Sequence, residues 1–122
     1  MRARNPNEAE YRDLYSGLIR LHILYHSSKE PVFGLEMIEE LGRHGYKLSP
    51  GTMYPLLHGM EKKGWLRSYQ QGGRHDRRVY RATVEGRKAL GIAKKRVREL
   101  FSELFENVLQ AALAKRSRRI RA

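Results

Sequence analysis

The strongest constraint on the fold is a self-contained helix signature at residues 49–64, which read SPGTMYPLLHGMEKKG. Ser49 has a side chain that is preferred at a helix N-cap, and Pro50 suits the first helical position, where its missing N–H costs nothing. Gly64 supplies a stop signal at the other end. Between these signals the apolar residues recur at i, i+3, i+4 and i+7, as one buried face requires: Met53, Leu56, Leu57 and Met60. The opposite face of this short helix is therefore free for another purpose.

Two helices are expected before this stretch. Apolar residues recur at helical spacing from about Glu10 to Ser27, on a stripe wide enough to touch more than one neighbour. Pro31 then interrupts the pattern, because proline disfavours helix at the residue before it. A second, shorter helix is expected from Val32 to about Arg43, and glycines flank its end. The chain thus places three short helices in succession.

A β-hairpin is expected after the third helix. Residues 65–71 (WLRSYQQ) and 78–83 (RVYRAT) are β-prone runs, and a polar loop that contains Gly72 and Gly73 joins them. A lone hairpin is marginally stable in water, so it must pack against the helices. Arginine, glycine and histidine dominate its tip, which makes it a basic projection on a two-stranded ribbon.

The last expected element is one long helix, which Thr83 can cap and which continues to about Ala114. Its apolar residues repeat at spacings of three and four over several turns, as in a coiled-coil seam. Three short helices cannot cover so wide a stripe, so a second copy of the chain is the natural partner. The first helix is expected to contribute to the same interface. We therefore expect a homodimer that buries Leu14, Leu18, Leu90, Val97, Leu100, Phe101, Leu104 and Val108.

The charge of the chain indicates the kind of partner it binds. Its 122 residues include 25 Lys and Arg against 13 Asp and Glu, a formal net charge of +12, and the sequence pI is about 10.4. The excess gathers at residues 74–78 (RHDRR) and 115–121 (KRSRRIR). Such clusters favour a polyanionic partner, nucleic acid above all, although the terminal cluster is best interpreted as a solubilising tail.

Several classes of protein are excluded by what the sequence lacks. No apolar run approaches the ~20 residues that cross a bilayer, and the N-terminus lacks the apolar core of a signal peptide, so a cytoplasmic protein with no membrane partner is expected. The absence of cysteine removes disulfides, thiolate zinc sites and cysteine nucleophiles. No nucleophile or carboxylate pair has an orienting partner at a recognisable spacing. We therefore expect no enzymatic activity, no catalytic residue and no cofactor.

The two histidines of the first helix raise the question of a metal site. His22 and His26 lie at i and i+4, a spacing that is able to bind a metal ion. Two neutral ligands alone make a poor zinc site, however, and no glutamate follows in an HExxH arrangement. The sequence therefore favours a structural or interface role for this pair, and no metal ligand is predicted.

Three helices followed by a basic hairpin are typical of a winged helix-turn-helix, so the expected fold class is mainly α (α+β) with a two-stranded wing. Residues 1–83 would form this domain, and residues 84–122 the dimerisation helix and basic tail. The third helix of this fold enters the major groove, where a face without carboxylates, with small residues and hydroxyls, is suitable. The candidate DNA contacts of this helix are Ser49, Gly51, Thr52, Tyr54, Pro55, His58, Lys62 and Lys63. The candidate contacts of the wing are Gly73, Arg74, His75, Arg77 and Arg78, whose cations would bind phosphates of any sequence.

These segments resemble the motifs of PadR-type transcriptional regulators. Residues 49–57 (SPGTMYPLL) and 60–64 (MEKKG) are similar to the third-helix motif of that family, approximately GTLYPLLxRLExxG. Residues 72–74 (GGR) and 78–86 (RVYRATVEG) are similar to its GGR wing and the KYYRLTxxG-like run that follows, and residues 34–38 (GLEMI) to its GYEI segment. The resemblance covers most of residues 14–90. It implies a homodimeric, repressor-like regulator of double-stranded DNA, with a single C-terminal helix for dimerisation.

The two third helices of such a dimer would bind an inverted-repeat operator. Short members of the family can hold a planar ligand with an aromatic residue, but Val97 occupies that position here. The sequence therefore leaves open whether an unidentified small-molecule effector releases the protein from DNA. Two other binding modes also stay open from the sequence: a double-stranded RNA-binding module and a protein-interaction winged helix without operator specificity. Tyr54 can either contact DNA or pack at the junction of helix and wing.

Overall fold

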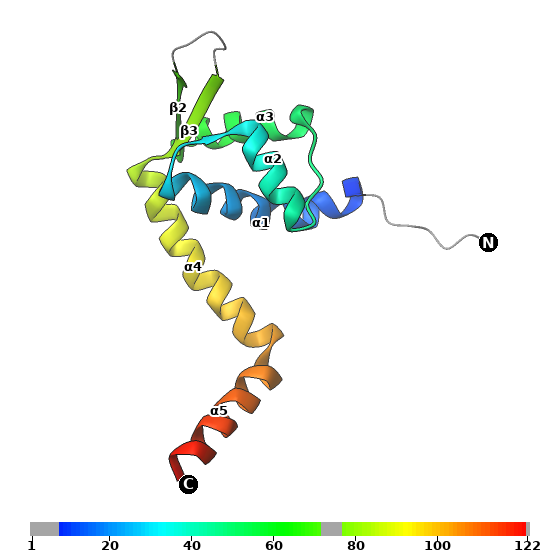
Figure 1. Cartoon of the computed structure of the whole chain (residues 1–122), viewed down its shortest axis with the longest axis vertical. Helices are drawn as coiled ribbons and strands as arrows, with labels where there is room; N and C mark the ends of the chain where they lie inside the picture. The colour runs from blue at the N-terminus through cyan, green and yellow to red at the C-terminus, as the bar shows by residue number, and fades with distance from the viewer. Residues whose placement is uncertain (1–7, 72–76, 122) are drawn as a thin grey trace, which may run out of the picture. The chain divides into compact units, whose positions relative to one another are not determined.

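The computed structural model describes residues 8–71 and 77–121, which form five helices and three strands (Figure 1). The chain divides into two compact units, Met1–Leu90 and Gly91–Ala122. The elements follow in the order α1 (Glu8–Lys29), β1 (Val32–Phe33), α2 (Gly34–Arg43), α3 (Pro50–Lys62), β2 (Leu66–Gln71), β3 (Arg77–Ala82), α4 (Val84–Leu104) and α5 (Glu106–Arg121). The predicted order of three helices, a hairpin and a helical C-terminal segment is confirmed.

The sheet contains one strand more than the sequence predicted. Within the described residues β1, β3 and β2 form a three-stranded antiparallel sheet in that order. Val32 pairs with Tyr80 and Phe33 with Val79, so the prediction that α2 begins at Val32 is wrong. Phe33 has an extended backbone, and its N–H donates to Glu36 Oε1 at 3.0 Å, which starts the helix at Gly34.

The core of the first unit lies between the three helices and the sheet. Met53, Leu57 and Met60 of α3 are almost completely buried, as predicted, while Leu56 is half-buried at the edge of the core. The other buried members come from every neighbouring element: Ile19, Ile23 and Leu24 of α1, Val32 of β1, Met37 and Leu41 of α2, Leu48, Leu66 of β2, Tyr80 of β3 and Leu90 of α4. The apolar face of α3 therefore anchors this helix and leaves its other face available.

The hairpin is joined to α4 by a cap that the sequence predicted. The N–H of Gly86 donates to Thr83 Oγ1 at 2.9 Å, and Thr83 Oγ1 donates to the carbonyl of Gly64. Thr83 therefore both caps α4 and ties its start to the turn after α3. Gly64 adopts φ +80°, a left-handed conformation that glycine tolerates at a helix end.

The C-terminal segment is not the single helix that was predicted. α4 ends at Leu104 and α5 begins at Glu106, so Phe105 interrupts the helix. Neither proline nor glycine lies at this point, and the apolar period runs through it, which explains why the sequence pattern did not reveal the break. The rings of Phe101 and Phe105 pack against each other at 4.8 Å between centroids. None of the helices in the described residues is long and apolar enough to cross a membrane.

Candidate nucleic-acid interface

The N-terminus of α3 is formed by the backbone of Ser49. Ser49 is extended, and its carbonyl accepts the N–H groups of Thr52 and Met53 at 3.0 and 2.9 Å. Ser49 thus occupies the predicted N-cap position, but its side chain does not cap the helix: its Oγ lies 3.4 Å from Thr52 Oγ1. Pro50 occupies the first turn as expected. The Ser49 hydroxyl, which is not engaged by the backbone, lies at the positive end of the helix dipole and is available for an anion.

The free face of α3 is short, uncharged at its start and basic at its end. Gly51, Pro55, His58 and Lys62 are exposed, and the helical period places them along one side. α3 contains a single acidic residue, Glu61, which lies next to the sheet. The prediction of a face without carboxylates therefore holds for this exposed side of the helix.

Glu61 is held by a network that the sequence did not predict. Its Oε2 accepts the Ser68 N–H at 2.8 Å and also the Ser68 hydroxyl. Ser68 Oγ in turn accepts Arg78 Nη1 at 2.8 Å, so the network joins α3, β2 and β3. No sequence spacing reveals it, because Glu61 and Ser68 become neighbours only through the turn between α3 and β2. The single carboxylate of α3 thus fastens the helix to the hairpin.

A groove of about 380 Å³ lies between α3 and the sheet. It brings Tyr54 and His58 of α3 together with Arg77 and Arg78 of β3. These are four of the predicted contact residues, two from the helix and two from the wing. The remaining lining residues are Phe33, Gly34, Leu35 and Glu36, at the start of α2, and Tyr80.

The Tyr54 ring packs against Gly34 at the start of α2 and shares a groove with Arg77, Arg78 and Tyr80 of β3. The residue is half-buried, and its ring lies so close to Gly34 that a Cβ there would be 2.7 Å from Tyr54 Cε1. Beside it, burial and then the charge of Glu61 raise the pKa of Tyr80 above its ordinary value, so the Tyr80 hydroxyl stays protonated. Tyr54 therefore has a structural role whether or not it also touches a ligand.

Thr52 is not brought together with Tyr54 and His58. It is half-buried and lines a separate pocket of about 280 Å³, with Arg12, Ser16 and Arg20 of α1. The predicted recognition face is thus divided between two sides of α3. Thr52 belongs to the side that is next to α1.

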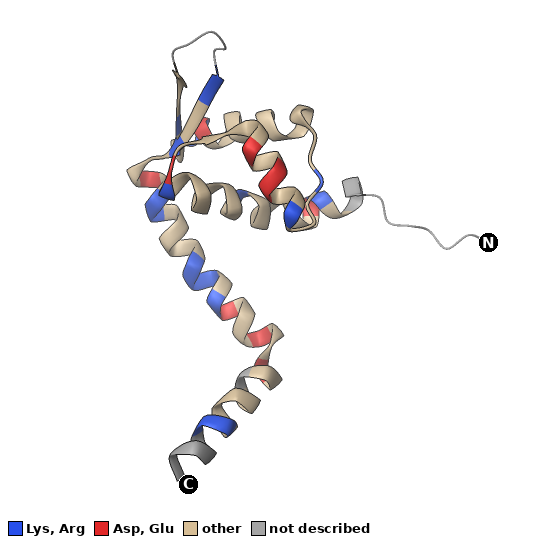
Figure 2. Cartoon of the chain, viewed as in Figure 1, with Lys and Arg blue, Asp and Glu red and all other residues tan. Residues whose placement is uncertain are grey.

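Besides Arg12 and Arg20 of α1, basic residues lie at the C-terminal end of α3 and on β3, where Figure 2 marks them. Lys62 is exposed, Lys63 Nζ lies 4.9 Å from the centre of the Trp65 ring, and the Arg77 guanidinium lies 5.6 Å from that of Phe33. These aromatic contacts orient the two cations without neutralising them. The wing residues Gly73, Arg74 and His75 lie outside the described residues.

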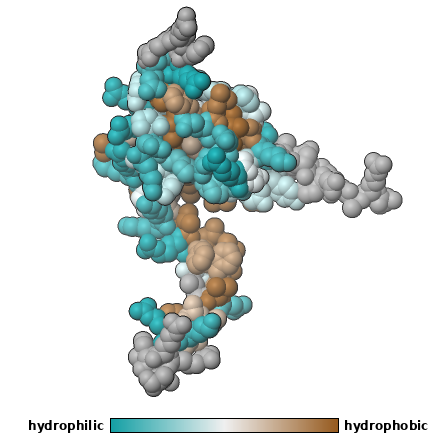
Figure 3. Space-filling model, in the orientation of Figure 1, coloured by the Kyte–Doolittle hydropathy of each residue, from teal (hydrophilic) through white to brown (hydrophobic). Residues whose placement is uncertain are grey.

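Most of the predicted dimer residues have large exposed apolar side chains. Leu14 is 71% exposed and Leu104 65%, and Leu18, Val97, Leu100, Phe101 and Val108 are exposed as well. Figure 3 shows hydrophobic side chains along the C-terminal helices. Leu90 is the exception: it is only 9% exposed and belongs to the core of its own chain, so its assignment to the interface was wrong. Its position in the first turns of α4 places it against the helices and sheet of the first unit instead.

Comparison with known proteins connects this arrangement to one family. A sequence model described as the transcriptional regulator PadR-like family matches residues 23–92. The chain is 46% identical over 95 residues to the transcriptional regulator Rv3488 of Mycobacterium tuberculosis, a match that covers 76% of this chain and 88% of that protein.

Solved structures agree with the sequence match. A PadR family transcriptional regulator from Eggerthella lenta DSM 2243 superposes with a TM-score of 0.70 at 26% identity, over 82% of this chain and 89% of the other. A PadR-like transcriptional regulator from Bacillus cereus strain ATCC 14579 superposes with a TM-score of 0.66 at 30% identity, over 80% and 97% of the two chains. The family match extends over α2, α3, the sheet and the start of α4.

Proposed function

This chain belongs to the PadR-like family of transcriptional regulators, and from that premise we propose that it is a homodimeric repressor that binds an inverted-repeat operator. Membership makes it a DNA-binding regulator of transcription and not an enzyme. The homodimer, the inverted-repeat operator and repression as the mode of regulation are our proposals beyond family membership.

In this proposal the exposed side of α3 enters the major groove. Gly51 and Pro55, in its N-terminal half, are small and uncharged, so the backbone can approach the bases without repelling phosphates. His58 offers a ring nitrogen to a base edge, and Pro55 an apolar surface to a thymine methyl. The Ser49 hydroxyl, at the positive end of the helix dipole, suits a phosphate beside the groove.

The wing would supply affinity that does not depend on sequence. Arg77 and Arg78 lie on β3 beside the groove that Tyr54 and His58 line. Arg78 is anchored through Ser68 to Glu61, while Arg77 is exposed and has its guanidinium over Phe33. Cations held at the edge of a groove-entering helix are placed to bind the phosphates that flank the contacted bases. Lys62 and Lys63 would extend this contact at the end of α3.

The exposed apolar side chains of α4 and α5 support a homodimer. Val97, Leu100 and Leu104 repeat at spacings of three and four within α4, and all three are at least 42% exposed. Burying a side chain of this size contributes about 1.5–3 kcal/mol, so a few from each chain suffice to offset the cost of association. Leu14 and Leu18 give α1 an exposed apolar side of its own, which we assign to the same interface.

Repression follows from the simplest use of such a dimer, since a protein that occupies an operator blocks other proteins from the same DNA. Release would require an effector that binds the free dimer better than the DNA-bound one. We leave the chemistry of such an effector unassigned.

The observation that carries the proposal is the groove in which recognition-helix and wing residues converge, beside an α3 face without carboxylates. The test is selection of preferred sites from random duplex DNA by the native protein and by the His58→Ala and Thr52→Ala variants. We expect an inverted repeat whose half-site centres lie about 10 bp, or a multiple of it, apart. We also expect His58→Ala to change the preferred bases at a cost of about 1–3 kcal/mol per altered pair.

Two results would contradict parts of this proposal. A selected site without two-fold symmetry would exclude the dimeric arrangement on the operator. Equal retention on duplex RNA and duplex DNA at moderate salt would indicate recognition of a double helix by shape, without operator specificity.

A further inference from the structure

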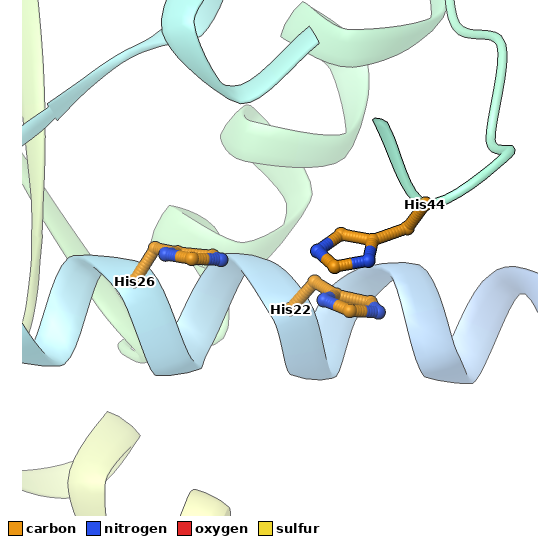
Figure 4. A group of neighbouring side chains, drawn as sticks. All are labelled: His22, His26 and His44. Atoms are coloured by element: carbon orange, nitrogen blue, oxygen red, sulfur yellow. The ribbon is translucent and has the colours of Figure 1, made fainter. Parts of the chain in front are cut away.

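Three histidines from two helices lie together on the side of α1 that faces α2. His22 and His26 project from α1, and His44 comes from the residue that caps the C-terminus of α2 (Figure 4). Each offers a ring nitrogen, and these atoms all lie within 4.8 Å of one another. The rings of His22 and His44 stack at 4.7 Å between centroids. His22 and His26 are half-buried, whereas His44 is exposed.

A carboxylate completes the group. Glu40 Oε1 lies 3.6 Å from His26 Nε2 and 3.4 Å from His44 Nε2. The other oxygen, Oε2, accepts Arg43 Nη1 at 2.5 Å. Arg43 therefore holds the carboxylate by one oxygen and leaves the other directed at the histidines, in the way that outer residues orient the ligands of metal sites.

The distances suit a small tetrahedral ion. Bonds of about 2.0–2.1 Å to nitrogen or oxygen place neighbouring ligand atoms of a tetrahedron about 3.3–3.4 Å apart. The two separations from Glu40 Oε1 are already close to this value. The ring nitrogens must come closer together to bind one ion, and we expect side-chain rotation to achieve this, for which His44 is suitable because it is exposed and lies at the end of its helix.

The donor set also selects the class of ion. Imidazole suits zinc, copper, iron and nickel, whereas calcium and magnesium prefer ligand sets made of oxygen alone. A neutral imidazole binds such an ion through the lone pair of one ring nitrogen.

We propose that His22, His26, His44 and Glu40 form a binding site for one divalent transition-metal ion of the zinc type. The sequence alone could not support this site, because His22 and His26 offered two ligands, and the other two are brought beside them only by the packing of α2 on α1. A bound ion would tie α1 to the end of α2. From there residues 45–48 lead directly to the start of α3. A bound ion would therefore stabilise the position of α3 relative to α1 and α2.

The test uses the full chain without a polyhistidine tag, freed of metal by a chelator and titrated with Zn²⁺ in competition with a chromogenic indicator. The principal variant is His44→Ala, since this side chain is exposed and its loss should not disturb the core. Glu40→Gln and His22→Gln test the other ligands. His58→Ala is the matched control, because His58 is an exposed histidine of α3 that lies outside the cluster.

We expect one Zn²⁺ per chain with submicromolar affinity, weakened by about 100-fold in His44→Ala and His22→Gln and by about 10–100-fold in Glu40→Gln. The control should bind as the native chain does. Saturating Zn²⁺ should also raise the melting temperature of the native chain and of His58→Ala, but not that of His44→Ala, because an ion that binds only the folded state stabilises it. Circular dichroism at matched concentration checks that each variant is folded.

Three outcomes would overturn the site. The first is the absence of Zn²⁺ binding at micromolar concentration by the native chain. The second is native affinity in a folded His44→Ala variant, which would place the ion elsewhere. The third is loss of binding in His58→Ala. All three readouts are independent of DNA binding, so they do not depend on the proposed repressor function.

Discussion

Gly86 lies where the first turn of α4 passes over the start of the hairpin, and there is no space there for a side chain. A Cβ built on Gly86 would overlap the carbonyl oxygen of Trp65 and lie 3.0 Å from its carbonyl carbon. That oxygen also accepts the Thr83 N–H at 3.0 Å. The obstructing atom therefore belongs to backbone that is already hydrogen-bonded and cannot rotate away. Gly86→Ala must displace either α4 or the strand that follows Trp65.

The size of the effect follows from two opposing terms. Overpacking a close contact costs about 1–3 kcal/mol, and here relaxation is limited because the neighbour is backbone. Replacing a glycine inside a helix with alanine stabilises the folded protein by up to about 0.5–1 kcal/mol. We expect a net loss of about 1–2 kcal/mol in the free energy of unfolding, or roughly 4–8 °C in melting temperature for each kcal/mol.

Gly91→Ala is the matched control in the same helix. Nothing in the described structure lies within 4 Å of a Cβ at Gly91, so this variant should be more stable by about 0.5–1 kcal/mol. Both variants would be unfolded in urea at one fixed protein concentration, because the midpoint would depend on concentration if the protein is dimeric as proposed. If Gly86→Ala were as stable as Gly91→Ala, the close approach of α4 to Trp65 would be refuted.

Three further predictions concern assembly and DNA binding. Leu104→Glu should convert the proposed homodimer into monomers, measured as solution mass by light scattering. Ser102→Glu, on the opposite side of α4, should leave it dimeric, and equal masses of the two variants would exclude this face as the interface. Arg77→Ala should weaken binding to every duplex and reduce the slope of log K against log salt by about 0.9 for each phosphate that is no longer neutralised. An unchanged slope would remove Arg77 from the phosphate-binding residues. Gly34→Ala should push the Tyr54 ring into the groove and so weaken DNA binding. The free energy of unfolding should change by less than about 1 kcal/mol, because the obstructing atoms belong to a side chain, which can move, and not to backbone. Native affinity in this variant would show that the groove does not contact DNA.

The sequence was a reliable guide wherever one segment carried a complete local signal. α3 has its cap position, proline, apolar period and stop within sixteen residues, and its buried face was predicted correctly except that Leu56 lies at the edge of the core. The hairpin and the Thr83 cap are also local patterns. In each case the residues that decide the structure are close neighbours in the chain.

The predictions failed where distant residues decide the structure. Val32 and Phe33 become a strand because β3 is there to pair with them, although their own sequence can begin a helix. Leu90 continues the apolar period of α4 but is covered by the core of its own chain, which periodicity cannot distinguish from an interface. His44 and Glu40 join His22 and His26 only because α2 packs on α1.

The Glu61 network joins α3 to β2 and β3, so the helix and the wing would act as one unit in the proposed binding to DNA. A carboxylate on a DNA-facing helix would repel phosphates, yet α3 retains one, and its hydrogen bonds to Ser68 direct it at the sheet. Hydrogen bonds to a charged group contribute about 1.5–3 kcal/mol each, more than those between neutral groups. Ser68 also accepts a hydrogen bond from Arg78 and so holds this cation of the wing. Because Glu61 and His58 lie on the same helix, the network sets the position of Arg78 relative to His58. In the proposed binding mode, a wing that is held to the helix in this way would fix the spacing between phosphate contacts and base contacts, so that non-specific affinity adds to sequence recognition on the same DNA.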